Sequence, residues 1–189
     1  MNAPALLDMP RRLLLRIEDF LILNDTGVLD GFSKSELIDG EIITVNSQFQ
    51  RHSYAKNELA FCLRGALGKA SSLIVLCEVS VAMPPHDMPE PDIVVMRGPI
   101  GVGAVALDKI ILLVEVADTT REFDLGRKAA LYARHGVPEY WVVDLPSAEI
   151  VCHWQPGADG FARRDAIAFG MPITAATLPD LTIETAGLG

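Results

Sequence analysis

The pattern of apolar and polar residues predicts a chain in which short helices and strands follow one another. Residues 11–23 mix apolar and charged positions at helical spacing, and they predict a short surface helix. In residues 36–45, Asp39-Gly40 is a preferred two-residue turn between strand-like arms, which predicts a β-hairpin. Small and apolar residues then recur at helical spacing from 50 to 70, and this period predicts a helix with one buried face.

The remaining apolar runs predict strands. Rich in β-branched residues, they span 73–83, 91–96, 110–117, 139–144, 148–155 and 160–168. The first of them should end at Pro84-Pro85, because proline cannot continue a strand ladder. The run at 110–117 (IILLVEVA) is almost wholly apolar, which is typical of a strand covered on both faces.

A helix is predicted after the strand at 110–117. Thr119, with Glu122 three positions later, fits a capping box that opens this helix. Gly136 and Pro138 should end it after about residue 135. The residues from 171 onward indicate only structure at the edge of a sheet. We therefore expect an α/β fold with α+β character: a central mixed sheet flanked by helices, with an N-terminal hairpin and C-terminal antiparallel strands.

The composition is that of a globular protein. Half of the 189 residues are apolar and 22% are charged. Because no repeat or linker divides the chain, we expect one domain spanning 1–189. Charged residues interrupt the apolar clusters near the N-terminus, so no membrane segment is predicted and a cytoplasmic location is expected. Cys62, Cys77 and Cys152 are interpreted as buried thiols in a reducing compartment.

The net charge of −9 opposes broad electrostatic capture of a nucleic acid, because such capture needs clustered Lys and Arg facing phosphates. Arg121, Arg127, Lys128 and Arg134 lie close together in the chain and could form a local basic patch. Such a run of charge is more often a solvated helix face. Both interpretations stay open at this point.

Three residues carry candidate chemistry. Glu115 is the one charged residue of the predicted buried strand, and a buried carboxylate needs a metal or a basic side chain as its partner. Asp92 follows Pro91 in the preceding strand, so the two carboxylates could project toward one cation. Oxygen ligands suit Mg²⁺ or Mn²⁺, which also bind substrate phosphates. Lys128 borders the helix face that packs on the sheet and could stabilise charge on a phosphate.

Each of the two carboxylates also has a simpler interpretation. Taken singly, Glu115 could pair with a surface Arg, and Asp92 could cap a turn after proline. Their occurrence together with Lys128, in this order of strands and helix, favours a shared site.

Several segments together resemble a family of bacterial restriction-endonuclease-like proteins within the PD-(D/E)XK superfamily. They are ELIDGEI at 36–42, His52 at the start of the first core helix, PDIVV at 91–95, LLVEVADTTREFDLGRKAALYARHGVPEYWVVD at 112–144, and the hairpin that follows. The resemblance covers most of the chain, and it implies a restriction-endonuclease-like core.

The resemblance also implies a site. Asp92 and Glu115 would hold Mg²⁺ or Mn²⁺, and Lys128 would be the catalytic lysine. Four further residues would line the site: Glu36, His52, Asp124 and Tyr132. The superfamily usually has its lysine two residues after the Glu, where this chain has Ala117, so that role would pass to Lys128. Where the family commonly has Ser-Pro, this chain has Asp118-Thr119, which is compatible with a turn.

These features favour a Mg²⁺-dependent endonuclease that hydrolyses phosphodiester bonds in nucleic acid, with DNA as the expected substrate. A homodimer is expected by analogy with nucleases of this fold. The acidic composition instead favours a non-catalytic binding or assembly protein that retains the fold. An enzyme acting on a small phosphorylated molecule is a third alternative.

Overall fold

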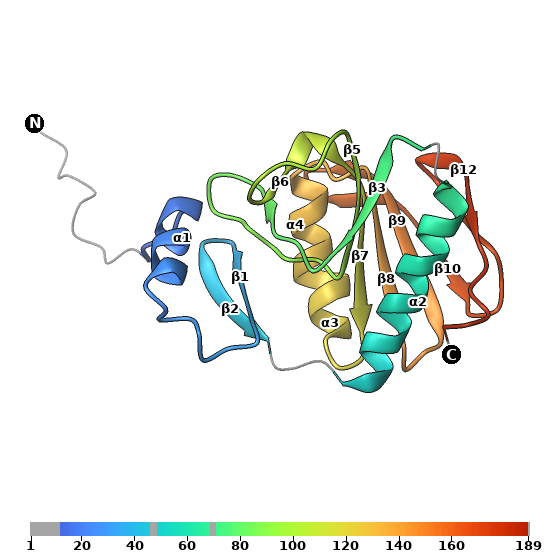
Figure 1. Ribbon diagram of the computed structural model, residues 1–189, viewed down its shortest axis with the longest axis horizontal. Helices are drawn as coiled ribbons and strands as arrows, with labels where there is room; N and C mark the ends of the chain where they lie inside the picture. Colours follow the sequence, from blue (N-terminus) through green and yellow to red (C-terminus); the bar gives the residue numbers. More distant parts are fainter. Residues whose placement is uncertain (1–11, 46–48, 69–70, 189) are drawn as a thin grey trace, which may run out of the picture.

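A central mixed sheet of six strands organises the fold (Figure 1). The computed structural model describes residues 12–45, 49–68 and 71–188. In chain order, the strands of the sheet are β3 (Leu73–Cys77), β5 (Ile93–Arg97), β7 (Ile110–Ala117), β8 (Glu139–Asp144), β9 (Glu149–Gly157) and β10 (Gly160–Ala168). They lie in the order β10-β9-β8-β7-β5-β3, and only β7 and β8 of these neighbours run parallel.

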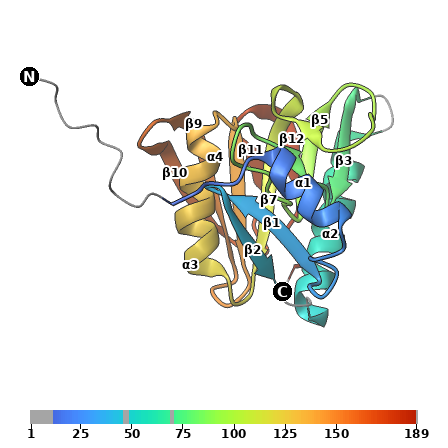
Figure 2. The ribbon, with the colours of Figure 1, turned by 90° about the vertical axis from the view of Figure 1, so that its left-hand side faces the viewer.

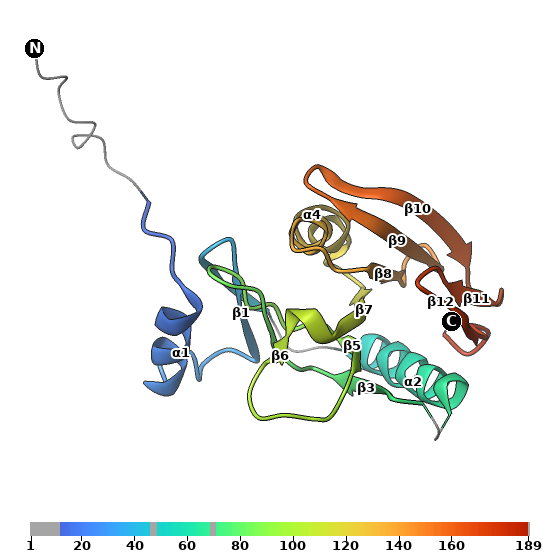
Figure 3. The ribbon, with the colours of Figure 1, turned by 90° about the horizontal axis from the view of Figure 1, so that it is seen from above.

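One face of the sheet is covered by α2 (Gln50–Leu67) and by a C-terminal hairpin (Figure 3). The hairpin consists of β11 (Ile173–Ala175) and β12 (Leu178–Ile183). Buried Glu139 holds this hairpin, because its carboxylate accepts hydrogen bonds from the Ala176 and Thr177 amides. The C-terminal hairpin thus packs in the same core as α2, on the same face of the sheet.

The opposite face is covered by one helical segment that connects β7 to β8 (Figure 3). Its parts are α3 (Arg121–Phe123), the π-helical turn η2 (Asp124–Lys128) and α4 (Ala129–Arg134). A parallel strand pair needs such a crossover. Because side chains of β7 alternate between the faces, Val114 packs in the core under α2 and Leu113 in the core under α4.

An N-terminal hairpin and helix lie beside the sheet (Figure 2). These elements are α1 (Ile17–Asp25), β1 (Lys34–Ile38) and β2 (Glu41–Val45). The turn residues Asp39 and Gly40 have positive φ angles of 52° and 72°, the conformation that Asp-Gly turns favour. Phe20 of α1 packs against Leu37 of β1 in a separate small core.

Most predicted elements are confirmed. The mixed sheet, the flanking helices, the hairpin at 36–45, the helix from 50 and the strands at 110–117 and 139–144 are present. The unassigned tail forms the β11–β12 hairpin. The first helix begins at Ile17 rather than residue 11, which lies outside the described residues. Within the described part of the chain, no helix is long and apolar enough to cross a bilayer.

Three predictions are wrong. The strand expected at 73–83 ends at Cys77, because Glu78 turns the chain with a φ of 51°. Beyond it, β4 (Val81–Ala82) pairs instead with β6 (Val105–Ala106), which precedes the short turn η1 (Leu107–Lys109).

The capping box predicted at Thr119 and Glu122 is not formed. Thr120, not Thr119, precedes α3, and its hydroxyl donates a hydrogen bond to the Asp124 side chain at 2.5 Å rather than capping the helix. Of the three cysteines, only Cys152 is buried, while Cys62 and Cys77 are partly exposed.

Candidate active site

Asp92 immediately precedes β5, and Glu115 lies in the neighbouring strand β7. Ile93 lies opposite Val114 in this antiparallel pair, so the register places Asp92 opposite Glu115. The Val116 amide donates a hydrogen bond to Asp92 Oδ2 at 2.8 Å, which ties the start of β5 to the end of β7. Each carboxylate residue is only 3% exposed. The two acids therefore meet at one edge of the sheet, as the sequence predicts.

His52 of α2 orients Asp92. Its Nε2 atom lies 3.2 Å from Asp92 Oδ2, while its Nδ1 atom is buried and has no hydrogen-bond partner among the described residues. Burial by itself would raise the pKa of Asp92, but the hydrogen bonds from His52 and Val116 and the nearby Lys34 hold that pKa below its usual value. Asp92 is therefore an ionised carboxylate with a defined orientation.

Lys128 lies between two buried carboxylates. Its Nζ atom is 2.8 Å from Glu115 Oε1 and 3.0 Å from Glu36 Oε1. Burial would lower the pKa of Lys128, but Glu115 and Glu36 raise it above its usual value, so the ammonium stays charged. Tyr132 also fixes the Glu115 carboxyl group, because its hydroxyl donates a hydrogen bond to Glu115 Oε1 at 2.8 Å.

A π-helical turn brings Lys128 and Asp124 into the site. In η2 the Ala129 amide donates to the Asp124 carbonyl, five residues back, and the Tyr140 hydroxyl donates to the same carbonyl at 3.0 Å. Such turns are often found at functional sites because they alter which side chains face inward. Asp124 and Lys128 are each only 3% exposed.

Carboxyl groups outnumber ammonium groups in this cluster. Burial raises the pKa of Glu115 to about 8, although Lys128 opposes the shift. Burial likewise raises the pKa of Asp124 to about 6, against the effects of Lys128 and Thr120. Glu36 is fully buried, and its Oε2 atom has no hydrogen-bond partner among the described residues. An additional cation would favour the ionised form of these carboxyl groups and so lower their raised pKa values.

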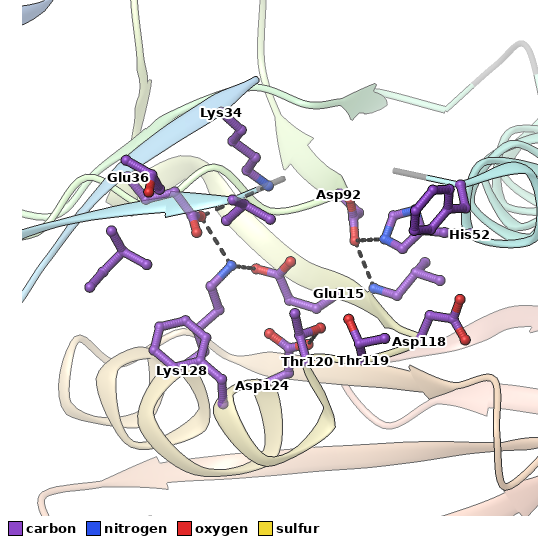
Figure 4. Close-up of a pocket in the computed structure, with 16 residues that line it drawn as sticks. Lys34, Glu36, His52, Asp92, Glu115, Asp118, Thr119, Thr120, Asp124 and Lys128 are labelled. Carbon is purple, nitrogen blue, oxygen red and sulfur yellow. Dashed lines mark hydrogen bonds and ion pairs between the residues drawn. The ribbon is translucent and has the colours of Figure 1, made fainter. Parts of the chain in front are cut away.

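The cluster opens into a cavity of about 430 Å³ (Figure 4). Six of the seven residues predicted for the site line it: Glu36, His52, Asp92, Glu115, Asp124 and Lys128. Tyr132 does not line the cavity and reaches it only through Glu115. Ala117, at the position where the superfamily usually has its lysine, is fully buried at the end of β7. The ammonium that contacts Glu115 is that of Lys128.

Sequence reasoning missed Lys34 as a residue of the cavity. Its Nζ atom lies 3.9 Å from Glu36 Oε1. Lys34 and Glu36 are two positions apart on β1 and so share one face of the strand, a signal that could have paired them once Glu36 was suspected. Asp118 and Phe49 also line the cavity and were not predicted there.

The donor chemistry of the cavity fits a hard divalent cation. Asp92 and Glu115 present carboxylate oxygens, and both hydrogen bonds of Glu115 to described residues fall on Oε1, which leaves Oε2 available. Within the described residues, no three His, Cys, Asp or Glu side chains are grouped closely enough to hold a metal by themselves. A site of two carboxylates completed by water and substrate oxygens is the arrangement that Mg²⁺ commonly takes.

The four clustered basic residues do not form a free patch. Arg127 pairs with Asp39 and Glu41, each at 2.9 Å. Arg134 likewise pairs with Asp39, Arg121 pairs with Asp144, and Lys128 is buried in the site. Three of these charges are therefore paired with carboxylates, and the fourth, that of Lys128, lines the cavity.

Comparison with known proteins agrees with this fold. The Uma2 family model, described as "Putative restriction endonuclease", matches residues 17–186. A crystal structure from Anabaena variabilis ATCC 29413, of "a putative nuclease belonging to DUF820", superposes with a TM-score of 0.70 and 15% identity, covering 92% of this chain and 97% of that chain. At this identity the structural likeness shows the fold alone. No curated protein matches the sequence.

Proposed function

This chain belongs to the Uma2 family, and we propose that it is a Mg²⁺-dependent endonuclease that hydrolyses phosphodiester bonds in DNA. The observation that carries the proposal is the convergence of Asp92, Glu115 and Lys128 on one cavity. Nuclease descriptions of the matched family and of the similar fold support it.

The protein side chains would divide the work as follows. Asp92 and Glu115 would hold the cation, and His52 would keep Asp92 in its orientation. The Lys128 ammonium, fixed by Glu115 and Glu36, would stabilise negative charge that develops on the phosphate. Lys34, which lines the cavity beside Glu36 on β1, would contact a substrate phosphate oxygen. Bound Mg²⁺ would supply Lewis-acid polarisation of the phosphate and lower the pKa of water.

The first test is cleavage of DNA. Supercoiled plasmid, linear duplex, single-stranded DNA and RNA are incubated with the protein in Mg²⁺, in Mn²⁺ and in EDTA. We expect cleavage of DNA that depends on the divalent cation. Glu115→Gln and Lys128→Met should each lower the rate by at least about a hundred-fold, because the first removes a carboxylate that would hold the cation and the second removes the ammonium that would act on the phosphate.

A matched control is Asp108→Asn, which removes an exposed carboxylate in η1, outside the cavity. This variant should cleave at the wild-type rate. Cleavage that survives in Glu115→Gln, or that persists in EDTA, would contradict the assignment of the site.

A non-catalytic protein that retains the fold is the second candidate. It is favoured by one observation, that the ammonium of Lys128 lies 2.8 Å from Glu115 Oε1 and can itself compensate the charge of that carboxylate. Thermal unfolding distinguishes the two. A working site gains stability from Mn²⁺ by mass action, and Asp92→Asn should abolish the gain. A melting temperature that does not change with Mn²⁺, together with no cleavage, would favour the non-catalytic protein.

A further inference from the structure

Two aromatic side chains project into solvent beside the cavity. Phe49, which immediately precedes α2, is 77% exposed, and Tyr54 in the first turns of α2 is 55% exposed. Single exposed apolar residues are common on protein surfaces and need no explanation. These two are different because they line one hollow, and Phe49 also lines the cavity of the candidate active site.

The hollow adjoins the cavity at one residue, Phe49. It is shallow and open, and its lining residues are Phe49, Gln50, Arg51, Ser53, Tyr54 and Asn57. Phe49 lines both the hollow and the cavity that contains Asp92, Glu115 and Lys128. A polymer with a phosphate in the cavity would therefore place its neighbouring unit against Phe49, and Tyr54 lines the same hollow.

The lining of the hollow suits a nucleobase. Aromatic side chains stack on base faces, an interaction that contributes affinity for every base type. The amides of Gln50 and Asn57 offer both donors and acceptors for base edges. Arg51 adds positive charge, and its position is defined because it donates a hydrogen bond to the Leu145 carbonyl at 2.6 Å.

The base in such a hollow must be unpaired. In a duplex, neighbouring base pairs cover both faces of each base, so an aromatic side chain can stack only on a base that is single-stranded or turned out of the helix. Stacking also contributes affinity without many phosphate contacts. That suits a chain with a net charge of −9, in which Arg121, Arg127 and Arg134 are engaged by carboxylates.

We propose that Phe49 and Tyr54 form a stacking subsite for an unpaired nucleobase next to the scissile phosphate. The substrate class is then DNA with a single-stranded segment or an extruded base at the cleavage position. This inference rests on the proposed function, because it assigns the occupant of the hollow from the phosphate in the cavity.

The test measures binding without catalysis. Fluorescence anisotropy in EDTA compares a labelled single-stranded oligonucleotide with the duplex of the same sequence. We expect the wild-type protein to bind the single strand more tightly. Phe49→Ala and Tyr54→Ala should each weaken single-strand binding by about ten-fold and leave duplex binding almost unchanged.

Phe61→Ala is the matched control, because Phe61 lies on the same helix, is 72% exposed and does not line the hollow. It should bind like the wild-type protein. Phe49→Trp supplies a direct readout: the new indole should be quenched on addition of the oligonucleotide, since stacking places a base on its face.

Each outcome bears on the inference. No preference for the single strand, wild-type binding by Phe49→Ala and Tyr54→Ala, or an equal loss in Phe61→Ala would overturn it. Stacking-dependent binding without cleavage in Mg²⁺ or Mn²⁺ would uphold the subsite and contradict the nuclease. Cleavage by the wild-type protein, together with normal single-strand binding by Phe49→Ala and Tyr54→Ala, would support the nuclease and contradict the subsite.

Discussion

Lys128 is the residue on which the buried charges of the site depend. Its ammonium contacts Glu36 and Glu115, both almost fully buried. Removing one partner of a buried ion pair is costly because it leaves uncompensated charge, whereas replacing both partners costs less. The stability of the protein should therefore reflect this pairing even where no substrate or metal is present.

Lys128→Met should lower the free energy of unfolding at neutral pH by about 3 kcal/mol. Adding Glu115→Gln to that variant should restore part of the loss, because one unpaired carboxylate disappears. Urea denaturation measures both values. Lys109→Met, which changes a partly exposed lysine of η1, is the control and should cost little. Equal stabilities of Lys128→Met and wild type would show that the ion pair is not formed in solution.

Individual residues of the site differ in how far sequence predicted them. Asp92 and Glu115 were predicted because carboxylates next to buried strands need a partner, and Lys128 because it borders the helix face that packs on the sheet. The structure brings all three together. Lys34 was missed because it lies on the separate N-terminal hairpin. Its approach to the cavity depends on how that hairpin docks, which no local pattern encodes.

At the scale of elements, the N-terminal hairpin is held to the helical segment through Asp87. The Asp87 carboxylate accepts a hydrogen bond from the Asp39 amide at 2.5 Å, and it lies 2.8 Å from His135 Nε2 and 3.6 Å from Arg134. Burial would raise the pKa of Asp87, but the contacts with His135, Asp39 and Arg134 lower it below its ordinary value of 3.8. Because the hairpin carries Lys34 and Glu36, this clamp also positions one wall of the cavity.

The lowered pKa of Asp87 predicts a pH dependence of stability. A carboxylate whose pKa is lower in the folded state stabilises the fold above its unfolded pKa, and this contribution is lost as pH falls through the folded pKa. Asp87→Asn should cost about 2 kcal/mol at pH 7. The difference from wild type should shrink as pH falls from about 4, and melting temperatures across that range measure it. A difference that stays constant down to strongly acidic pH would contradict the clamp.

Elements with a strong local pattern were predicted correctly, and those shaped by contacts were not. The buried strand β7 and the Asp39-Gly40 hairpin follow from hydrophobic pattern and turn chemistry. The π-helical turn η2 lacks such a signal. Tyr140 from β8 binds its displaced carbonyl, so the turn depends on a contact between distant parts of the chain.

At the scale of the whole molecule, charge limits how a nucleic acid can be bound. The net charge is −9, and the arginines of the helical segment are paired with carboxylates. Affinity for DNA should then depend only weakly on salt, because few counterions are released. We expect a slope of log K against log salt no steeper than about −3, measured by anisotropy with Glu115→Gln. A slope steeper than about −6 would indicate an extensive basic surface.

The homodimer and the cytoplasmic location stay predictions.

The sequence by itself determined the mixed sheet with its covering helices and the acids and lysine that need partners, because periodicity and buried charge are local properties of the chain. The family followed from the resemblance of several segments, not from these patterns. Only the tertiary structure decided how these residues meet. The antiparallel register sets Asp92 opposite Glu115, the π turn directs Lys128 to Glu115 and Glu36, and hairpin docking adds Lys34. Such distances depend on packing between elements far apart in sequence, and so do the pKa values that follow from them.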